Sequence, residues 1–189
     1  MAFRDEFTGL PGRRALNERM QRLGRNYVLA MSDVDQFKKF NDTHGYDVGD
    51  QVLRLVASKL SKISGGGRAY RYGGEEFALV FAGKTLEECM PHLEVIRESI
   101  ASYSIQLRNQ ENRPNDDQQG RQRRAGSGAS SVSVTVSIGV AERVEQRNPE
   151  QVLKSADEAL YSAKGAGRNC VVAFGQNRRG AVRMDTAAG

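Results

Sequence analysis

Our expectation for the fold rests on the segment RAYRYGGEEFALVF at residues 68–81. Its two halves, 68–72 and 75–81, are rich in aromatic and aliphatic residues and predict two short strands. Gly73 and Gly74 lie between them. A two-residue Gly-Gly connection favours a tight hairpin, because glycine adopts a positive φ without steric cost. The segment therefore predicts a β-hairpin with its tip at Gly73 and two acidic residues, Glu75 and Glu76, directly after the turn.

The residues before this hairpin predict one strand and three helices. The run Tyr27–Ser32 is apolar enough for a buried strand, and it leads directly into Asp33-Val34-Asp35. Carboxylates at the end of a strand are exposed to solvent or to a ligand. The helices are expected from Pro11 to near Gly24, from about 36 to 43, and along an apolar stripe through 48–60 that ends at the glycines 65–67.

The residues after the hairpin alternate between helical and strand patterns. A helix is expected at 85–102, with Thr85 as N-cap and Glu88 completing a capping box. Alternating valines and isoleucine predict a half-buried strand at 132–140. A helix from Pro149 to Gly165 and a last strand at 169–174 complete the pattern. The intervening residues 108–131 are polar and basic and predict an insertion loop without a core, and the tail 176–189 is expected to be disordered.

This order of elements predicts an α+β fold of the ferredoxin-like palm type. Its central sheet would be mainly antiparallel and flanked by helices, and the 33–35 segment would lie beside the hairpin. The chain has 189 residues, of which 39% are hydrophobic and 27% charged, which suits one domain over 1–175. Its two cysteines are too far apart in sequence for a redox pair or a zinc site.

Four carboxylates could form a reactive centre. Asp33 and Asp35 end a strand, whereas Glu75 and Glu76 follow a hairpin tip. If these groups converge, a hard divalent cation with oxygen ligands would balance their repulsion, and Mg²⁺ is the expected ion. Bound with nucleotide phosphates, such an ion can orient an in-line attack on phosphorus. The alternative is that the four are solvated loop acids, and the spacing alone does not decide between the two.

A wider set of motifs resembles the GGDEF family of diguanylate cyclases, in its GGEEF form. The matching stretches are D-x-D-x-F-K-x-x-N-D at 33–42, Gly49-Asp50, GGEEF at 73–77, the opening motif DEFTGLPGRR at 5–14, SIGV at 137–140, and the closing helix and turn at 157–169. The likeness spans nearly the whole chain. It implies an enzyme that condenses two GTP into cyclic di-GMP and two pyrophosphates. Two domains, each carrying half of the site, would meet as a homodimer.

The resemblance also implies a role for each matching residue. Asp33, Glu75 and the carbonyl of Val34 would hold Mg²⁺, with Mn²⁺ as a substitute. Glu75 would act as base toward the 3′-hydroxyl, Lys38 would stabilise transition-state charge, and Glu76 and Asp35 would give nearby support. Asn41 and Asp50 would recognise guanine, whose donors and acceptors adenine cannot match. The phosphates would be bound by Lys38, Lys164, Arg168 and the backbone N–H groups of Phe37 and Lys38, with Gly73 and Gly74 permitting close approach.

One departure from the family pattern concerns regulation. Many relatives carry an Arg-x-x-Asp inhibitory site shortly before the Gly-Gly pair, but residues 64–67 read Ser-Gly-Gly-Gly here. We therefore expect no inhibitory site of that type and weak or no inhibition by cyclic di-GMP through it. Tyr46 also replaces a frequent histidine, and the 108–131 insertion has no counterpart in the family pattern.

Two other functions remain as alternatives. A degenerate GGDEF domain could bind GTP or a partner without catalysis, although Asp33, Lys38, Asn41 and Glu75 are all present. A nucleic-acid binder could use the arginines at 121–124, but interleaved aromatic residues are missing, so no nucleic-acid partner is expected. The net charge of +5 instead suits nucleotide phosphates. The sequence has no long apolar run and no signal-peptide core, so we expect a cytoplasmic location. We also expect the chain to be a catalytic piece of a longer signalling protein, and that parent protein could be membrane-attached.

Overall fold

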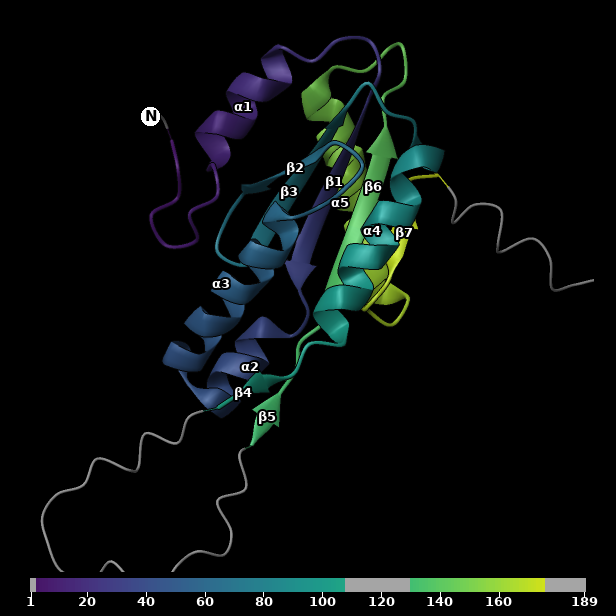
Figure 1. Ribbon diagram of the computed structural model, residues 1–189. Coiled ribbons are helices and arrows are strands. Elements are labelled where there is room, and N and C mark those ends of the chain that lie inside the picture. Colours follow the sequence, from purple (N-terminus) through teal and green to yellow (C-terminus); the bar gives the residue numbers. More distant parts are fainter. Residues whose placement is uncertain (1–2, 108–129, 176–189) are drawn as a thin grey trace, which may run out of the picture.

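The structure is a computed structural model that describes residues 3–107 and 130–175 (Figure 1). Its helices are α1 (Arg13–Gln21), α2 (Phe37–His44), α3 (Tyr46–Ser61), α4 (Leu86–Ala101) and α5 (Pro149–Gly165). Its strands are β1 (Tyr27–Val34), β2 (Gly67–Arg71), β3 (Glu76–Ala82), β4 (Ile105–Gln106), β5 (Ser131–Val132), β6 (Val136–Glu142) and β7 (Val171–Ala173). Within the described residues, no helix is both long and apolar enough to span a bilayer.

Five of the strands form one mixed sheet in the order β2-β3-β1-β6-β7. All neighbours are antiparallel except β6 and β7, which are parallel. Strand β1 is central and buried along its whole length. At its carboxyl end, Asp33 lies opposite Glu76 of β3 on one side and Ser137 of β6 on the other. The expected α+β palm with a mainly antiparallel sheet is confirmed, and the sheet brings the two acidic segments side by side.

Helices cover both faces of the sheet, and Figure 1 shows α4 in front of it and α5 behind it. Alternate residues of β1 supply the two cores, because successive side chains of a strand point to opposite faces. Val28, Ala30 and Val34 belong to the core that includes residues of α3 and α4. Leu29 and Met31 belong to the core that includes residues of α1 and α5. Asp33 lies two residues after Met31, so by the alternation of the strand it faces the same side as Leu29 and Met31, where it forms an ion pair with Lys164 of α5.

The hairpin is confirmed, but the expected two-residue turn is wrong. Strand β2 ends at Arg71 and β3 begins at Glu76, so four residues connect them. The N–H groups of Tyr72 and Gly73 both donate to the Glu76 carbonyl, at 2.9 and 3.2 Å. Neither Gly73 nor Gly74 has a positive φ. The wider loop is stabilised by Arg71, whose guanidinium donates to the carbonyls of both glycines.

The strand expected at 132–140 is divided in two. Its first residues pair with β4 in a separate two-stranded sheet, whereas β6 begins only at Val136 and continues to Glu142. The division lies where Asp35 donates its N–H to the Thr135 carbonyl and accepts the Thr135 hydroxyl. One contact is between backbones and the other between side chains 100 positions apart, and the apolar alternation cannot reveal either.

Other boundaries differ by a few residues. The first helix ends at Gln21 rather than near Gly24, and the last strand covers Val171–Ala173 rather than 169–174. The capping box of Thr85 and Glu88 is confirmed. Of the expected insertion, 108–129 lies outside the described residues, and Ser131 already belongs to β5. The tail 176–189 is outside them as well.

Candidate active site

Asp33 is the centre of the site. It is 5% exposed at the end of β1, with neighbouring strands on both sides. Its Oδ2 accepts a hydrogen bond from the Lys164 ammonium near the end of α5. Its other oxygen, Oδ1, is buried and has no hydrogen-bond partner among the described residues. Because an unsatisfied buried carboxylate oxygen is costly, this atom is an acceptor held ready for a cation or a donor.

Glu75 and Glu76 bring two more carboxyl groups to Asp33. Burial, followed by the charge of Asp33, raises the pKa of Glu75, and Lys164 only partly offsets this. Burial and then the charges of Asp33 and Asp157 raise the pKa of Glu76, against the opposing effect of Lys164. Like charges in a partly buried cluster favour proton uptake or a bound cation. The cluster is therefore short of positive charge.

The donor atoms fit a hard divalent cation. Asp33 offers a buried oxygen without a partner among the described residues, and it lies close enough to Glu75 for its charge to raise the pKa of Glu75. The N–H of Val34 donates to the Glu75 carbonyl at 3.3 Å, which holds the hairpin turn against the end of β1. No group of three or more His, Cys, Asp or Glu side chains suits a metal ion within residues 3–107 and 130–175. An ion here would thus take two carboxylates and complete its oxygen shell from carbonyl, water or phosphate.

Asp35 is near Asp33 in sequence but has a different environment. Its two oxygens accept the hydroxyls of Thr135 and Ser137, both at 2.6 Å. Its Oδ2 also accepts the Asn169 N–H at 3.0 Å. With both oxygens occupied in this way, Asp35 ties the end of β1 to β6 and to the turn before β7, a structural role for a residue expected to give nearby support.

Helix α2 begins three residues after β1 ends and offers an anion site. Gln36 precedes it in the left-handed conformation, with φ of 52°, which turns the chain sharply into the helix. The N–H groups of Phe37 and Lys38 fall in the first turn, where backbone donors lack helical partners. The Phe37 side chain is buried, whereas Lys38 is exposed. Neither Lys38 nor the exposed Arg168 forms an ion pair within the part of the chain that the structure describes.

Asn41 lies against Gly49, the residue before Asp50, where α2 packs against α3. A Cβ atom on Gly49 would fall 1.8 Å from Asn41 Oδ1, so only glycine at position 49 leaves room for the Asn41 side chain. Asn41 Oδ1 is itself buried without a hydrogen-bond partner among the described residues. Asp50 follows Gly49 directly and is partly exposed. Gly49 therefore links the two candidates for guanine recognition: its missing side chain leaves room for Asn41, and Asp50 is the next residue in α3.

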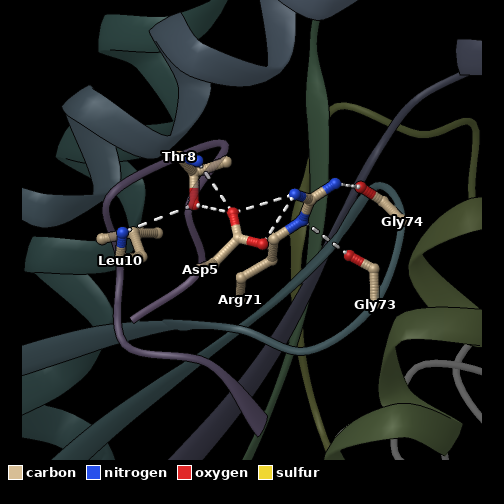
Figure 2. A network of polar contacts seen from close by, with 6 residues as sticks. All are labelled: Asp5, Thr8, Leu10, Arg71, Gly73 and Gly74. Atoms are coloured by element: carbon tan, nitrogen blue, oxygen red, sulfur yellow. Dashed lines mark hydrogen bonds and ion pairs between the residues drawn. The ribbon is translucent and has the colours of Figure 1, made fainter. Parts of the chain in front are cut away.

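Arg71 and Asp5 hold the hairpin turn in place, as Figure 2 shows. The Arg71 guanidinium donates to Asp5 at 2.9 and 3.1 Å, to the Gly73 carbonyl at 3.1 Å and to the Gly74 carbonyl at 2.8 Å. Asp5 also accepts the N–H and hydroxyl of Thr8. Sequence reasoning missed this role for both residues. The pair spans 66 positions, and no local pattern in one sequence can join them.

The structure thus brings Asp33, Glu75, Glu76 and Lys164 into one cluster and packs Asn41 against Gly49. A family profile described as "Diguanylate cyclase, GGDEF domain" matches residues 2–119 and 119–170. The chain belongs to the GGDEF domain family.

Named relatives agree with this assignment. This GGDEF domain is 37% identical over 172 residues to diguanylate cyclase VdcA of Vibrio cholerae, covering 89% of this chain and 46% of that protein. It is 34% identical over 181 residues to the response regulator PleD of Caulobacter vibrioides, covering 91% of this chain and 36% of that protein. The chain therefore spans less than half of these two relatives.

Solved structures agree as well. The GGDEF domain of DgcB from Caulobacter crescentus, determined in complex with c-di-GMP, aligns with a TM-score of 0.78 and 34% identity, covering 93% of this chain and 95% of that one. The active GGEEF domain of a diguanylate cyclase from Vibrio cholerae aligns with a TM-score of 0.64 and 26% identity, covering 86% and 91%. The fold described above is thus the GGDEF fold.

Proposed function

We propose that this GGDEF domain is a diguanylate cyclase that condenses two GTP into cyclic di-GMP and two pyrophosphates. The observation that carries the proposal is the buried Oδ1 of Asp33, which has no hydrogen-bond partner among the described residues and lies within a cluster of three carboxyl groups and Lys164. A cluster so short of positive charge suits a metal-bound triphosphate. The relatives named diguanylate cyclases support the same activity.

Asp33, Glu75 and the Val34 carbonyl would hold Mg²⁺, or Mn²⁺ in its place. The ion would supply charge neutralisation at the α-phosphate and its leaving group. Lys164 would bridge a carboxylate and a phosphate, and Lys38 would meet the charge that develops in the transition state. Arg168 and the N–H groups of Phe37 and Lys38 would bind the remaining phosphate oxygens.

Glu75 is our candidate for the base that takes the proton of the 3′-hydroxyl. Burial and Asp33 raise the pKa of Glu75, which strengthens it as a base, whereas Mg²⁺ bound to the same carboxylate would lower this pKa. Glu76, whose pKa is raised by burial and by Asp33, would support this role from the next position. Gly73 and Gly74 would let the nucleotide approach the turn closely.

Asn41 and Asp50 would select guanine. Asp50 can accept from N1–H and the 2-amino group, and the Asn41 amide can serve the neighbouring edge. Adenine lacks these groups and would leave the Asp50 carboxylate without its donors, so the site would discriminate against it. This assigns one GTP to each domain.

One domain holds only half of the reacting atoms, so cyclisation would need two domains face to face in a homodimer. Each 3′-hydroxyl would then attack the α-phosphate bound by the other domain, and two pyrophosphates would leave. We expect the rate per enzyme to rise with protein concentration until the dimer saturates.

The test is incubation with GTP and Mg²⁺ at several protein concentrations, with the product identified by mass. Asp33→Asn should abolish product, whereas Glu18→Gln, at an exposed position on α1, should leave it unchanged. GTP binding without any cyclic dinucleotide at every concentration would refute the cyclase and favour a degenerate binding module.

Product inhibition offers a separate prediction. A Cβ atom on Gly67 would lie 2.6 Å from the Phe81 ring, so an aspartate at that position would not fit. We therefore expect initial rates to be insensitive to low-micromolar cyclic di-GMP added at the start. Half-inhibition in that range through this domain would contradict the expectation.

A further inference from the structure

The turn between α5 and β7 has an unusual backbone. Gly167, Arg168 and Asn169 have φ values of 108°, 64° and 47° in succession. Only glycine takes such angles freely, so two consecutive residues with side chains in this region are disfavoured unless their surroundings hold them. Arg168 is one of the two, and its side chain is exposed.

Three contacts from three elements hold this turn. The Arg168 N–H donates to the Ala163 carbonyl of α5 at 3.1 Å. The Asn169 N–H donates to Asp35 Oδ2 at 3.0 Å, after the end of β1. Arg97 of α4 donates to Asn169 Oδ1 at 2.7 Å, across 72 positions of sequence. Asn169 is therefore fixed through its backbone on one side and through its side chain on the other.

Arg97 is suited to be the fixed end of this contact. Its side chain is 15% exposed, and its guanidinium also pairs with Glu94 at 3.0 Å and with Glu98 at 3.3 Å. A planar guanidinium with several simultaneous partners has little freedom to move. Among the described residues, Arg97 forms the only hydrogen bond to the Asn169 side chain. The contact of Asn169 with Asp35 is made by its backbone N–H.

We propose that Arg97 is a positioning residue for nucleoside triphosphate binding. It holds Asn169 so that the adjacent Arg168 presents its guanidinium to the terminal phosphates of the nucleotide. Arg97 itself does not touch the substrate. The proposal rests on the proposed function, in which Arg168 binds phosphate, and it adds that the affinity for the β- and γ-phosphates depends on a residue of α4.

The test compares GTP with GMP, because GMP lacks the phosphates that Arg168 would contact. Calorimetry with Mg²⁺ should show that Arg97→Met weakens GTP binding roughly tenfold, the size of one lost charge-assisted contact, and changes GMP binding little. Arg97→Lys keeps the charge but not the fork, and should recover only part of the loss. Arg68→Met, at an exposed arginine of β2, is the matched control and should bind both nucleotides as the wild type does.

A double-mutant cycle separates positioning from a general structural effect. If Arg97 acts through Arg168, then Arg97→Met combined with Arg168→Met should bind GTP no more weakly than Arg168→Met alone. An unchanged GTP-to-GMP affinity ratio in Arg97→Met, or full additivity with Arg168→Met, would overturn the proposal even if the melting temperature falls. Because binding is measured rather than turnover, a wild type that binds GTP but makes no product would refute only the cyclase activity. A wild type that binds no GTP would refute both.

Discussion

Arg71→Met is the most informative single change at the hairpin turn. Methionine keeps most of the aliphatic stem of arginine but none of its donors. Asp5 would lose its cation, and the carbonyls of Gly73 and Gly74 would lose the donors shown in Figure 2. The side chains of Arg71 and Asp5 are 17% and 24% exposed, so water would replace the lost contacts only in part.

The magnitude follows from these contacts. A charge-assisted hydrogen bond to a largely buried carboxylate is worth about 1.5–3 kcal/mol, and the two carbonyl contacts at the edge of the site add less. We expect a loss of about 2–3 kcal/mol and, at about 2–4 °C per kcal/mol for a domain of this size, a melting temperature lower by roughly 5–10 °C. Because the freed turn carries Glu75, cyclic di-GMP formation should fall by roughly 10–100-fold.

The pH dependence of the stability provides an internal check. Burial alone would raise the pKa of Asp5, but hydrogen bonds from Thr8 and Arg71 outweigh it, and the net effect is a lowered pKa. An acid whose pKa is lowered by folding stabilises the fold above its ordinary pKa, and this stabilisation is lost as the pH falls through the lowered value. The stability difference between wild type and Arg71→Met should therefore be full at neutral pH and shrink below about pH 4.

Thermal unfolding, denaturant unfolding between pH 3 and 7, and initial rates of product formation would measure these effects. Arg71→Lys retains one positive charge but cannot reach Asp5 and both carbonyls together, so it should fall between wild type and Arg71→Met. A melting temperature and a rate of Arg71→Met both within error of the wild type would refute the idea that this clamp positions the turn.

Three further changes test other parts of the site. Glu75→Gln should raise the melting temperature in EDTA by a few degrees at pH 7, because burial and Asp33 raise the pKa of Glu75 and make its charged form costly. The gain should shrink as the pH falls through the raised pKa and vanish below the ordinary value of 4.5, where the wild-type carboxyl is protonated in the folded and the unfolded state. Product formation should be lost, and equal melting temperatures of variant and wild type at pH 7 would contradict the prediction. Gly49→Ala should displace the Asn41 side chain, because the new Cβ would fall 1.8 Å from Asn41 Oδ1. We expect the affinity for GTP to drop at least about tenfold and the preference of the domain for GTP over ATP to narrow, with little loss of stability because alanine favours helix. An unchanged affinity for GTP would exclude a role of Asn41 in guanine recognition. Burial raises the pKa of the Cys89 thiol to about 12, so Cys89 should resist alkylation at pH 8 in the folded protein and react only on unfolding. Mass spectrometry of labelled peptides measures this, and rapid modification of Cys89 in the folded protein would contradict the prediction.

The helices and most strands could be predicted from the sequence because their signals are local. The Thr85 capping box and the apolar stripe of α3 each depend on residues a few positions apart. The alternation at 132–140 predicted a strand, but the expectation that it is half-buried was wrong, because β6 is buried on both faces up to Ala141. The GGEEF run also predicted the hairpin and the position of Glu75 and Glu76 at its turn. The predicted two-residue turn was wrong: Arg71 donates hydrogen bonds to the carbonyls of Gly73 and Gly74, and neither glycine adopts a positive φ.

The roles of individual site residues needed the tertiary structure. The sequence alone supplied the residue types of the site, from the carboxylates Asp33 and Glu75 to the amide of Asn41, and a family pattern in which to place them. Packing decided that one oxygen of Asp33 has no partner within the part of the chain that the structure describes, whereas both oxygens of Asp35 accept hydrogen bonds from Thr135, Ser137 and the turn before β7. Packing also joined Arg97 to Asn169 across 72 positions. Contacts between distant segments depend on how whole elements pack, and no periodicity or short motif in a single sequence encodes them.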